Sequence, residues 1–355
     1  MLTIGVLVKT PDPRGPLSSA LLDALGSAPA AAPGLPALAE AAGTALEQTA
    51  DIFRDEDVQL ALFCLYELHY TGLDGVDAGW EWHPGLLAVR VRLEQAYEAA
   101  LRRLVRLPEP PQATSAAVAD ALFTLTGNDD GPSVSRFVAA SATREQLQEF
   151  LVHRSIYQLK EADPHSWAIP RLTGRAKAAL VEIQADEYGG GRAHRMHSTL
   201  FAGTLRGVGL EDSYGAYIDH IPAVTLAALN MMSLFGLNRR LRGAIVGHLA
   251  AFEMTSSIPN RFYARGVRRL GYGDDVALYF DEHVEADAVH EQIAARDMAG
   301  GLAEASPELV PDILFGTAAC LAMDAMVGGH QLAAWQNGTS SLRLPLPEPV
   351  GSATI

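Results

Sequence analysis

The chain has 355 residues, of which 48% are hydrophobic and 19% are charged, and its formal net charge is -15. This length can bury a sizeable core and accommodates one large domain or two smaller ones. The acidic balance argues against nucleic acid or anionic membrane as the main partner. Cys64 and Cys320 are too few for a disulfide framework or a zinc ribbon, so we expect two reduced thiols.

The first and the most apolar segments of the chain predict neither a secretory signal nor a membrane span. Residues 1–9 have no basic lead and only a short apolar stretch. The most apolar run, residues 221–237, is interrupted by Asn230 and carries Pro222 and Gly236 near its ends. We therefore expect a cytoplasmic protein in which no apolar run reaches membrane-spanning length.

The first third of the chain predicts an irregular lead-in followed by helices. Residues 1–35 are rich in Pro, Gly, Ala and Ser, which are typical of irregular structure. Apolar residues at helical spacing then predict helices over residues 37–70, 86–107 and 114–126. The sequence Asn128-Asp-Asp-Gly-Pro132 predicts a loop and is the best candidate for a domain boundary. Residues 1–130 are therefore predicted to form an N-terminal helical region.

Long helices are predicted for most of the remaining chain. We expect them over residues 144–162, 175–188, 193–208, 213–235, 239–270, 274–303 and 307–337. Strand-like alternation is weak everywhere, so the predicted fold class is all-α. A bundle of this length offers a core lined by inward side chains, where such folds build metal sites. We assign residues 131–340 to this domain and residues 341–355 to a tail.

The segment 281–290 carries the strongest signal for chemistry. On a helix His283, Asp287 and His290 are spaced i, i+4, i+7 and lie on one face. Two imidazoles and a carboxylate that converge there suit a borderline transition metal such as iron. A solvated acidic face is the alternative, because further glutamates lie between or beside these positions.

Three glutamates upstream could complete such a site. Glu253 lies in the apolar residues 245–255, where a buried carboxylate requires a cation or a paired base. Glu187 precedes three consecutive glycines, which indicate a helix break that could re-aim a ligand. Glu161 closes a helix, where a residue in a solvated turn is the alternative interpretation.

Further histidines compete for a role in this site. An undistorted helix places His194 near the face of Glu187 and rotates His197 away from it. The glycines remove the continuity that this argument needs, so both remain candidates. His248, in the same helix as Glu253, is more typical of a satisfied core histidine. Together with one of His194 or His197, the candidates supply four carboxylates and three imidazoles. This number of ligands is enough for two iron ions and leaves positions open for dioxygen. Such a mixed set suits iron or manganese better than structural zinc, which usually binds thiolates.

Taken in this order, the motifs resemble those of the haem-oxygenase-like diiron oxidases, a family of iron-containing redox enzymes. The resemblance spans residues 140–335 and is most similar to the branch of amine N-oxygenases that has a seventh metal ligand. It rests on Leu159-Lys-Glu161-Ala-Asp-Pro164, Asp186-Glu-Tyr-Gly-Gly-Gly191, Met196-His197-Ser-Thr-Leu-Phe201, Phe252-Glu253-Met and His283-x3-Asp287-x2-His290. The chain departs from ferritin-like diiron proteins, because it lacks a pair of Glu-x-x-His motifs.

The resemblance implies a seven-helix haem-oxygenase-like bundle with an additional N-terminal helical region that mediates dimerisation, and hence a homodimer. It selects His197 over His194 and implies that Glu187 and Glu253 are the critical catalytic pair. The metal ligands that it implies are Glu161, Glu187, His197, Glu253, His283, Asp287 and His290.

The activity implied by the resemblance is an O2-dependent oxygenation in specialised metabolism. Two Fe(II) ions would reduce O2 to a peroxo-diiron(III) species, which oxidises an amine or guanidine nitrogen of a small amino-acid-derived substrate. An external electron donor would reset the irons. One alternative keeps the cofactor but performs desaturation, oxidative decarboxylation or C–C cleavage of a fatty or amino acid. Another is a haem-oxygenase-like binding bundle without diiron chemistry.

Overall fold

The structure, a computed structural model, describes residues 7–127 and 133–346, except for the side chains of residues 285–288. Within these ranges the chain is almost wholly helical, and a single bridge between Val8 and Leu73 is the one β contact. This confirms the all-α fold class. The expected boundary at residues 128–132 lies outside the described residues, as do residues 347–355 of the expected tail, so the division into domains stays a prediction.

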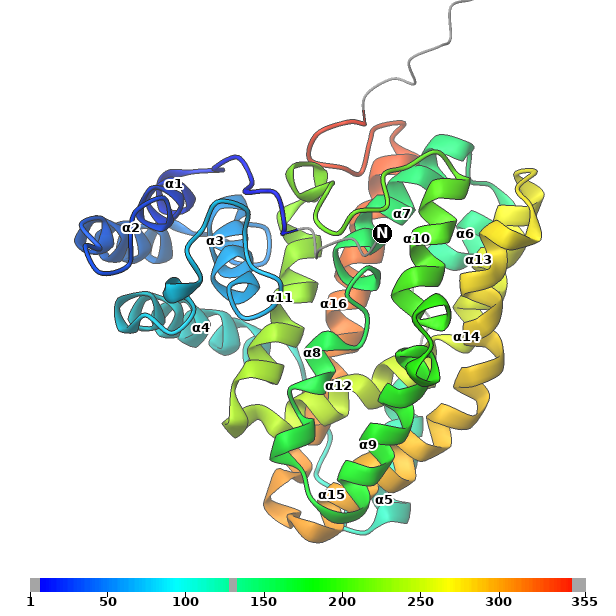
Figure 1. The fold of residues 1–355 in the computed structure, drawn as a ribbon. Helices are drawn as coiled ribbons and strands as arrows, with labels where there is room; N and C mark the ends of the chain where they lie inside the picture. Colours follow the sequence, from blue (N-terminus) through cyan, green and yellow to red (C-terminus); the bar gives the residue numbers. More distant parts are fainter. Residues whose placement is uncertain (1–6, 128–132, 347–355) are drawn as a thin grey trace, which may run out of the picture.

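Four helices near the N-terminus form a layer on one side of the molecule (Figure 1, blue to cyan): α1 (Pro16–Leu25), α2 (Leu35–Gln48), α3 (Glu56–Glu67) and α4 (Pro84–Leu104). The predicted irregular lead-in is wrong for α1, which begins with Pro16 and buries Leu17, Leu21 and Leu25 along one face. The helix predicted over residues 37–70 is two helices, because Asp55 caps α3 by accepting hydrogen bonds from two backbone N–H groups.

The other helices form the bundle and its flanks. They are α5 (Ser115–Thr126), α6 (Val134–Ala140), α7 (Arg144–Gln158), α8 (Asp163–Ser166), α9 (Gly174–Glu187), α10 (His197–Gly207), α11 (Ala223–Leu237), α12 (Arg242–Thr255), α13 (Ser257–Arg269), α14 (Asp274–Gln292), α15 (Gly300–Ala305) and α16 (Val310–Gln336). A π-helical segment, Ile293–Ala299, joins α14 to α15. Single 3₁₀ turns occur at Ala78–Trp80, Ile169–Arg171, Gly189–Gly191, Ala193–Arg195, Ile218–His220, Arg239–Leu241 and Pro307–Leu309.

Two of the predicted long helices are shorter than expected. The helix predicted over residues 213–235 begins only at Ala223, directly after Pro222. The helix predicted over residues 239–270 is divided between α12 and α13 at Ser256. Pro259 in the first turn of α13 explains this division, because proline has no N–H and its ring collides with the carbonyl group one turn earlier.

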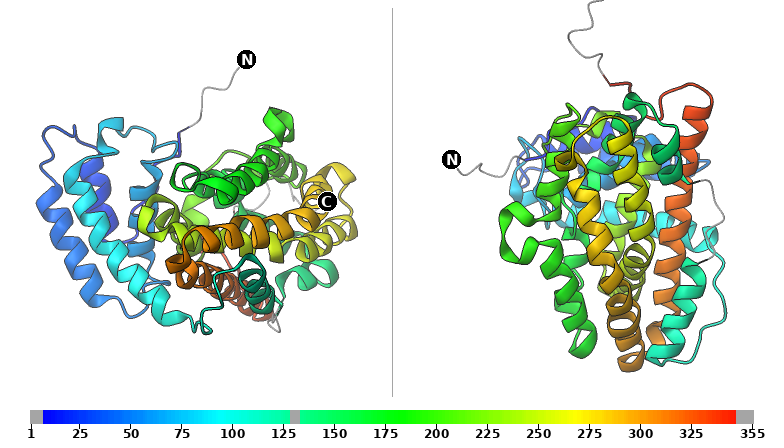
Figure 2. Two further views of the ribbon diagram at one scale, coloured as in Figure 1. Left: turned by 90° about the horizontal axis from the view of Figure 1, so that it is seen from below. Right: turned by 90° about the vertical axis from the view of Figure 1, so that its right-hand side faces the viewer.

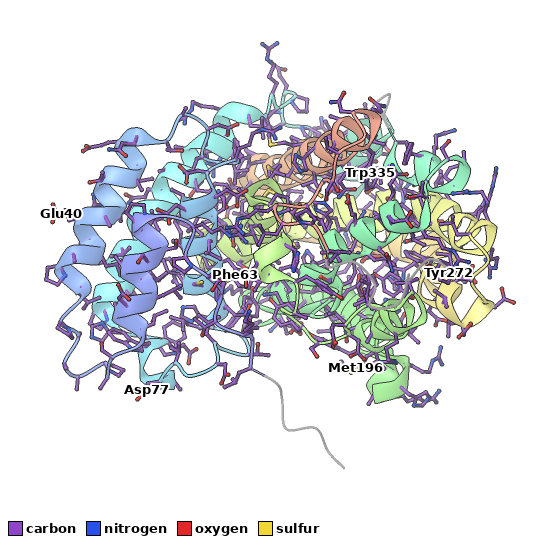
Figure 3. The ribbon with its side chains drawn as sticks, turned by 90° about the horizontal axis from the view of Figure 1, so that it is seen from above. Glu40, Phe63, Asp77, Met196, Tyr272 and Trp335 are labelled. Atoms are coloured by element: carbon purple, nitrogen blue, oxygen red, sulfur yellow. The ribbon has the colours of Figure 1, made fainter. Side chains whose placement is uncertain are left out.

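The apolar core is shared between the N-terminal layer and the bundle. Figure 2 shows the bundle helices side by side with the layer along one flank. One continuous cluster of buried side chains includes Phe63 of α3, Phe235 of α11 and Phe315 of α16. In Figure 3, Phe63 lies where the layer meets the bundle and Glu40 lies at the outer edge. A second cluster, which includes Phe201, packs between α7, α10, α13 and α14.

One segment of the described residues, Pro307–Gln336, is long and apolar enough to cross a membrane by length and composition, with a mean hydropathy of 1.5. The expectation that no segment reaches this length is therefore wrong, because alanines between the larger apolar residues keep the mean hydropathy high. However, 56% of its most apolar window is buried. It crosses α12 so closely that a Cβ at Gly247 would lie 1.9 Å from the carbonyl oxygen of Ile313. This is the packing of a core helix.

A buried ion pair joins the N-terminal layer to the bundle. Lys160 Nζ, just after α7, lies 3.0 Å from Glu67 Oε2 at the end of α3, and the two side chains are 5% and 0% exposed. Tyr214 and Thr71 each donate a hydrogen bond to the Glu67 carboxylate, both at 2.8 Å. Lys160 Nζ also lies 4.0 Å from the ring centroid of Tyr70. The pair therefore fixes the backbone directly before Glu161.

We expect the substitution Lys160→Met to lower the free energy of unfolding by about 3–5 kcal/mol, because it leaves the Glu67 charge buried without a cation. The double variant Lys160→Met/Glu67→Gln should recover most of this loss, since it removes both charges. Denaturant unfolding followed by circular dichroism measures both. Equal destabilisation of the single and double variants would show that the ion pair does not carry the effect.

Candidate metal centre

The helix break after α9 determines whether His194 or His197 contacts Glu187. Gly189 and Gly190 have φ values of 65° and 61°, in the left-handed region that favours glycine. A Cβ at Gly189 would lie 2.5 Å from the backbone carbon of Arg195, so the chain folds back on itself here. As a result His197 begins α10 as a buried residue, whereas His194 is exposed. The undistorted-helix argument for His194 is wrong, because the glycines turn the chain between the two helices.

The first cluster of possible ligands combines residues from three helices and one turn. One ligand atom from each of Glu161, Glu187, His197 and His283 lies within 4.8 Å of the others. The Nδ1 atom of His197 is 2.9 Å from Glu187 Oε2. The Nε2 atom of His283 is 3.6 Å from Glu161 Oε1. All four side chains are less than one-tenth exposed.

The second cluster shares a carboxylate with the first. It consists of Glu187, Glu253 and His290, whose ligand atoms again lie within 4.8 Å of one another. The Nδ1 atom of His290 is 3.3 Å from Glu253 Oε2. Glu187 belongs to both clusters and is the carboxylate that they share among the described residues. The seventh predicted ligand, Asp287, belongs to α14, but its side chain lies outside the described residues.

Hydrogen bonds orient the histidine rings toward these clusters. His283 Nδ1 lies 2.8 Å from the backbone oxygen of Tyr279, an acceptor, so this nitrogen donates and Nε2 keeps its lone pair. His290 Nε2 lies 2.9 Å from Asp186 Oδ2, which leaves Nδ1 as the ligand atom. A carboxylate behind a ligating imidazole is a common arrangement in metal sites, because it fixes the tautomer and raises the basicity of the ring.

Asp186 and Tyr279 contact ligand candidates, and the sequence reasoning assigned no role to either of them. Tyr279 lies one turn before His283 on α14, and its hydroxyl group donates to both oxygens of Glu161 at 2.9 Å. Asp186 immediately precedes Glu187. In both cases the one signal in the sequence was proximity to a candidate ligand.

The donor atoms fit a first-row transition metal. Glu187 Oε2, His197 Nδ1 and His290 Nδ1 are buried without a hydrogen-bond partner among the described residues. His197 Nδ1 and Glu187 Oε2 are close together, yet they lack hydrogen-bond geometry. Ligand bonds of about 2.0–2.2 Å at right angles place neighbouring donors about 3 Å apart, which matches this separation. Oxygen and imidazole donors without thiolate suit iron or manganese.

The charges of the clusters compensate one another. Burial raises the pKa of Glu187, but His197, His283 and His290 outweigh this and lower it overall. Burial lowers the pKa of His290, but Glu253 and Asp186 outweigh this and raise it to about 9. His290 is therefore protonated at neutral pH in the absence of a metal, and a bound metal would displace this proton.

The bundle and its two clusters define a helical metalloprotein with a carboxylate- and histidine-rich centre. The sequence profile of the iron-containing redox enzymes matches residues 148–325, a segment that contains both clusters and Asp287. The chain belongs to this haem-oxygenase-like family and is an oxidoreductase.

The chain is also similar to the nitrosourea synthase of Streptomyces achromogenes subsp. streptozoticus. The two are 32% identical over 203 residues, which cover 56% of this chain and 43% of that protein. The chain thus spans less than half the length of this relative.

We expect Glu187→Ala to abolish iron binding, whereas His290→Ala should remove iron from the second cluster alone, because Glu187 alone among the described residues belongs to both clusters. Iron content after anaerobic Fe(II) loading and desalting measures this, with about two ions per chain expected for the wild type. The exposed His194→Ala is the matched control and should load fully. Full loading of Glu187→Ala would contradict the shared-ligand arrangement.

We expect the affinity for a divalent metal to rise as the pH increases from 7 to 9. His290, whose pKa is about 9, must lose its proton before Nδ1 can bind the ion. The same raised pKa stabilises the metal-free protein below the ordinary histidine pKa of about 6.5, and this stabilisation is lost as the pH rises through 9. Titration with Co(II), followed by its visible absorption, measures the affinity, and thermal unfolding measures the stability. A metal affinity that is flat across this range would contradict proton displacement.

Proposed function

We propose that this protein is an O2-dependent non-haem diiron oxygenase that oxidises an amine or guanidine nitrogen of a small amino-acid-derived substrate. The observation that carries the proposal is the pair of buried ligand clusters with Glu187 in common. The similarity to a nitrosourea synthase supports nitrogen as the atom that is oxidised. Two irons bound there would supply electrons and a site for O2 reduction.

Each described ligand has a defined part in this proposal. Glu161, His197 and His283 would hold one ion, and Glu253 and His290 would hold the other. Glu187, which belongs to both clusters, would bind both ions. Carboxylates suit this task because they bind both iron oxidation states, change between bridging and terminal modes, and stabilise the higher charge of the ferric ions. The hydrogen bonds from Tyr279 to Glu161 limit how far that ligand can shift.

The stoichiometry requires further partners. Conversion of an amine to a hydroxylamine takes up one O2, two electrons and two protons, and releases one water. We therefore propose an external electron donor and a small-molecule substrate as the partners of the enzyme. The exposed carboxylate of Asp186 contacts His290 Nε2. It is thus placed to exchange that ring proton with solvent during turnover.

We expect iron-loaded protein to consume O2 and to add one oxygen atom to a nitrogen compound. Anaerobically loaded protein is mixed with O2 and a reductant in the presence of L-arginine, L-lysine or dodecanoate. O2 uptake and product mass are measured, and visible absorption is followed by stopped flow. A transient absorption that decays faster with L-arginine or L-lysine than with dodecanoate supports N-oxygenation. Turnover of dodecanoate alone contradicts it and favours attack on C–H bonds.

The variant Glu253→Ala separates the ligand role from a structural one. It should lower O2 uptake at least about a hundredfold, because removal of groups that only support ligands already costs about 10–100-fold. It should retain the helical circular dichroism of the wild type, and His194→Ala should retain activity. Unchanged O2 uptake in Glu253→Ala would refute the assignment.

A further inference from the structure

Two further buried histidines lie beside the candidate metal centre and belong to neither ligand cluster. His165 of α8 and His248 of α12 are each about 1% exposed. Their rings are hydrogen-bonded, with 3.0 Å between His165 Nε2 and His248 Nδ1. Glu161, a ligand candidate, directly precedes the turn into α8, and Glu253 lies further along α12 from His248. The carboxylate of Glu187 is close enough to act on His165 electrostatically.

One ring nitrogen of this pair lacks a hydrogen-bond partner among the residues that the structure describes. His165 Nδ1 is buried without a hydrogen-bond partner among the described residues. An unpaired buried polar atom is costly, so most such atoms in folded proteins bind water or a ligand. By contrast, His153, an equally buried histidine in α7, bonds Thr225 through Nδ1 and Ser341 through Nε2.

The surroundings of His165 favour a positively charged group with N–H donors. Burial lowers the pKa of His165 to about 4 and that of His248 well below its ordinary value, so both rings are neutral at neutral pH and offer no charge to a carboxylate. The rings of Tyr157 and Phe252 lie 6.4 and 5.9 Å from that of His165, measured between centroids. Both keep part of their surface accessible. Aromatic rings attract cations through their electron-rich faces.

We propose that His165 Nδ1 accepts a hydrogen bond from the guanidinium or ammonium group of the substrate, and that His248 positions His165 for this task. This inference rests on the proposed function for the identity of the substrate. His165 must then carry its proton on Nε2 and donate it to His248 Nδ1. The hydrogen bond between the rings fixes this tautomer, as carboxylates do for metal-bound histidines. The site thus holds the substrate nitrogen beside the two ligand clusters.

Binding without turnover tests the proposal. Iron-loaded protein is titrated anaerobically with L-arginine, and with L-norleucine, which has the same amino acid end but no N–H group at the head of its side chain. His165→Leu should weaken L-arginine binding about tenfold to a hundredfold and leave L-norleucine binding unchanged. His165→Asn, which keeps an acceptor near the position of Nδ1, should lose less. His153→Leu is the control for loss of a buried imidazole and should bind both ligands as the wild type does.

The partner ring is tested in the same way. His248→Asn keeps an acceptor for His165 Nε2–H and should bind L-arginine nearly as well as the wild type. His248→Leu removes that acceptor and should weaken binding. Equal losses in these two variants would contradict the positioning role. Iron content and thermal unfolding are recorded for every variant, so that a folding defect is recognised.

The outcomes distinguish this inference from the proposed function. If L-arginine binds in a His165-dependent manner but is not oxidised, the inference stands and the oxygenase proposal fails. If L-arginine is oxidised but His165→Leu binds it as tightly as the wild type, the inference is wrong and the oxygenase proposal stands. A uniform loss of affinity for both ligands in His165→Leu, or no binding of L-arginine to the wild type, also overturns the inference.

Discussion

The structure depends on the compensation of carboxylates that are buried inside an apolar bundle. A single buried carboxylate without a partner would cost several kcal/mol, and this protein places Glu161, Glu187 and Glu253 close together. Histidine is suited to compensate them, because it supplies a proton when the metal is absent and a lone pair when the metal is bound. The same rings therefore keep the fold stable and the centre ready for metal. This explains why His197, His283 and His290 are buried in direct contact with the carboxylates.

The metal centre also requires that the ligands, which come from different helices, are held in fixed positions. Glu161 leaves α7 through a turn in which Ala162 has a φ of 77°, a strained conformation for alanine that costs about 1–3 kcal/mol. The neighbouring Lys160 is held by Glu67 of the N-terminal layer, which stabilises this turn from the other side. The layer thus contributes to the metal centre without supplying a ligand, since it fixes the backbone from which Glu161 extends.

The sequence predicted the fold class and the residue types of the centre, because a carboxylate inside an apolar helix is costly unless a cation or a hydrogen bond compensates it. It could not place these residues in space. The choice between His194 and His197 depends on three glycines with positive φ, and helical spacing carries no information across such a turn. The contact between Glu67 and Lys160 joins segments far apart in the chain, which no local pattern reveals. Helix α1 was missed because composition suggested irregularity, although its leucines have helical spacing.

Helix α12 is largely buried because it both packs against α16 and carries polar side chains to the centre of the bundle. One side of the helix packs on α16 through Gly243 and Gly247, and the close approach leaves no room for larger residues there. Another side carries Glu253 to the ligand clusters, and His248 bonds His165 of α8. Rotation of this helix would move both polar side chains together, so the tight glycine contact with α16 fixes their relative positions. The π-helical segment that follows α14 buries Ala294, Ala295 and Met298, so the chain stays in the core directly after His290. The rigidity of the apolar packing therefore determines the geometry of the polar centre.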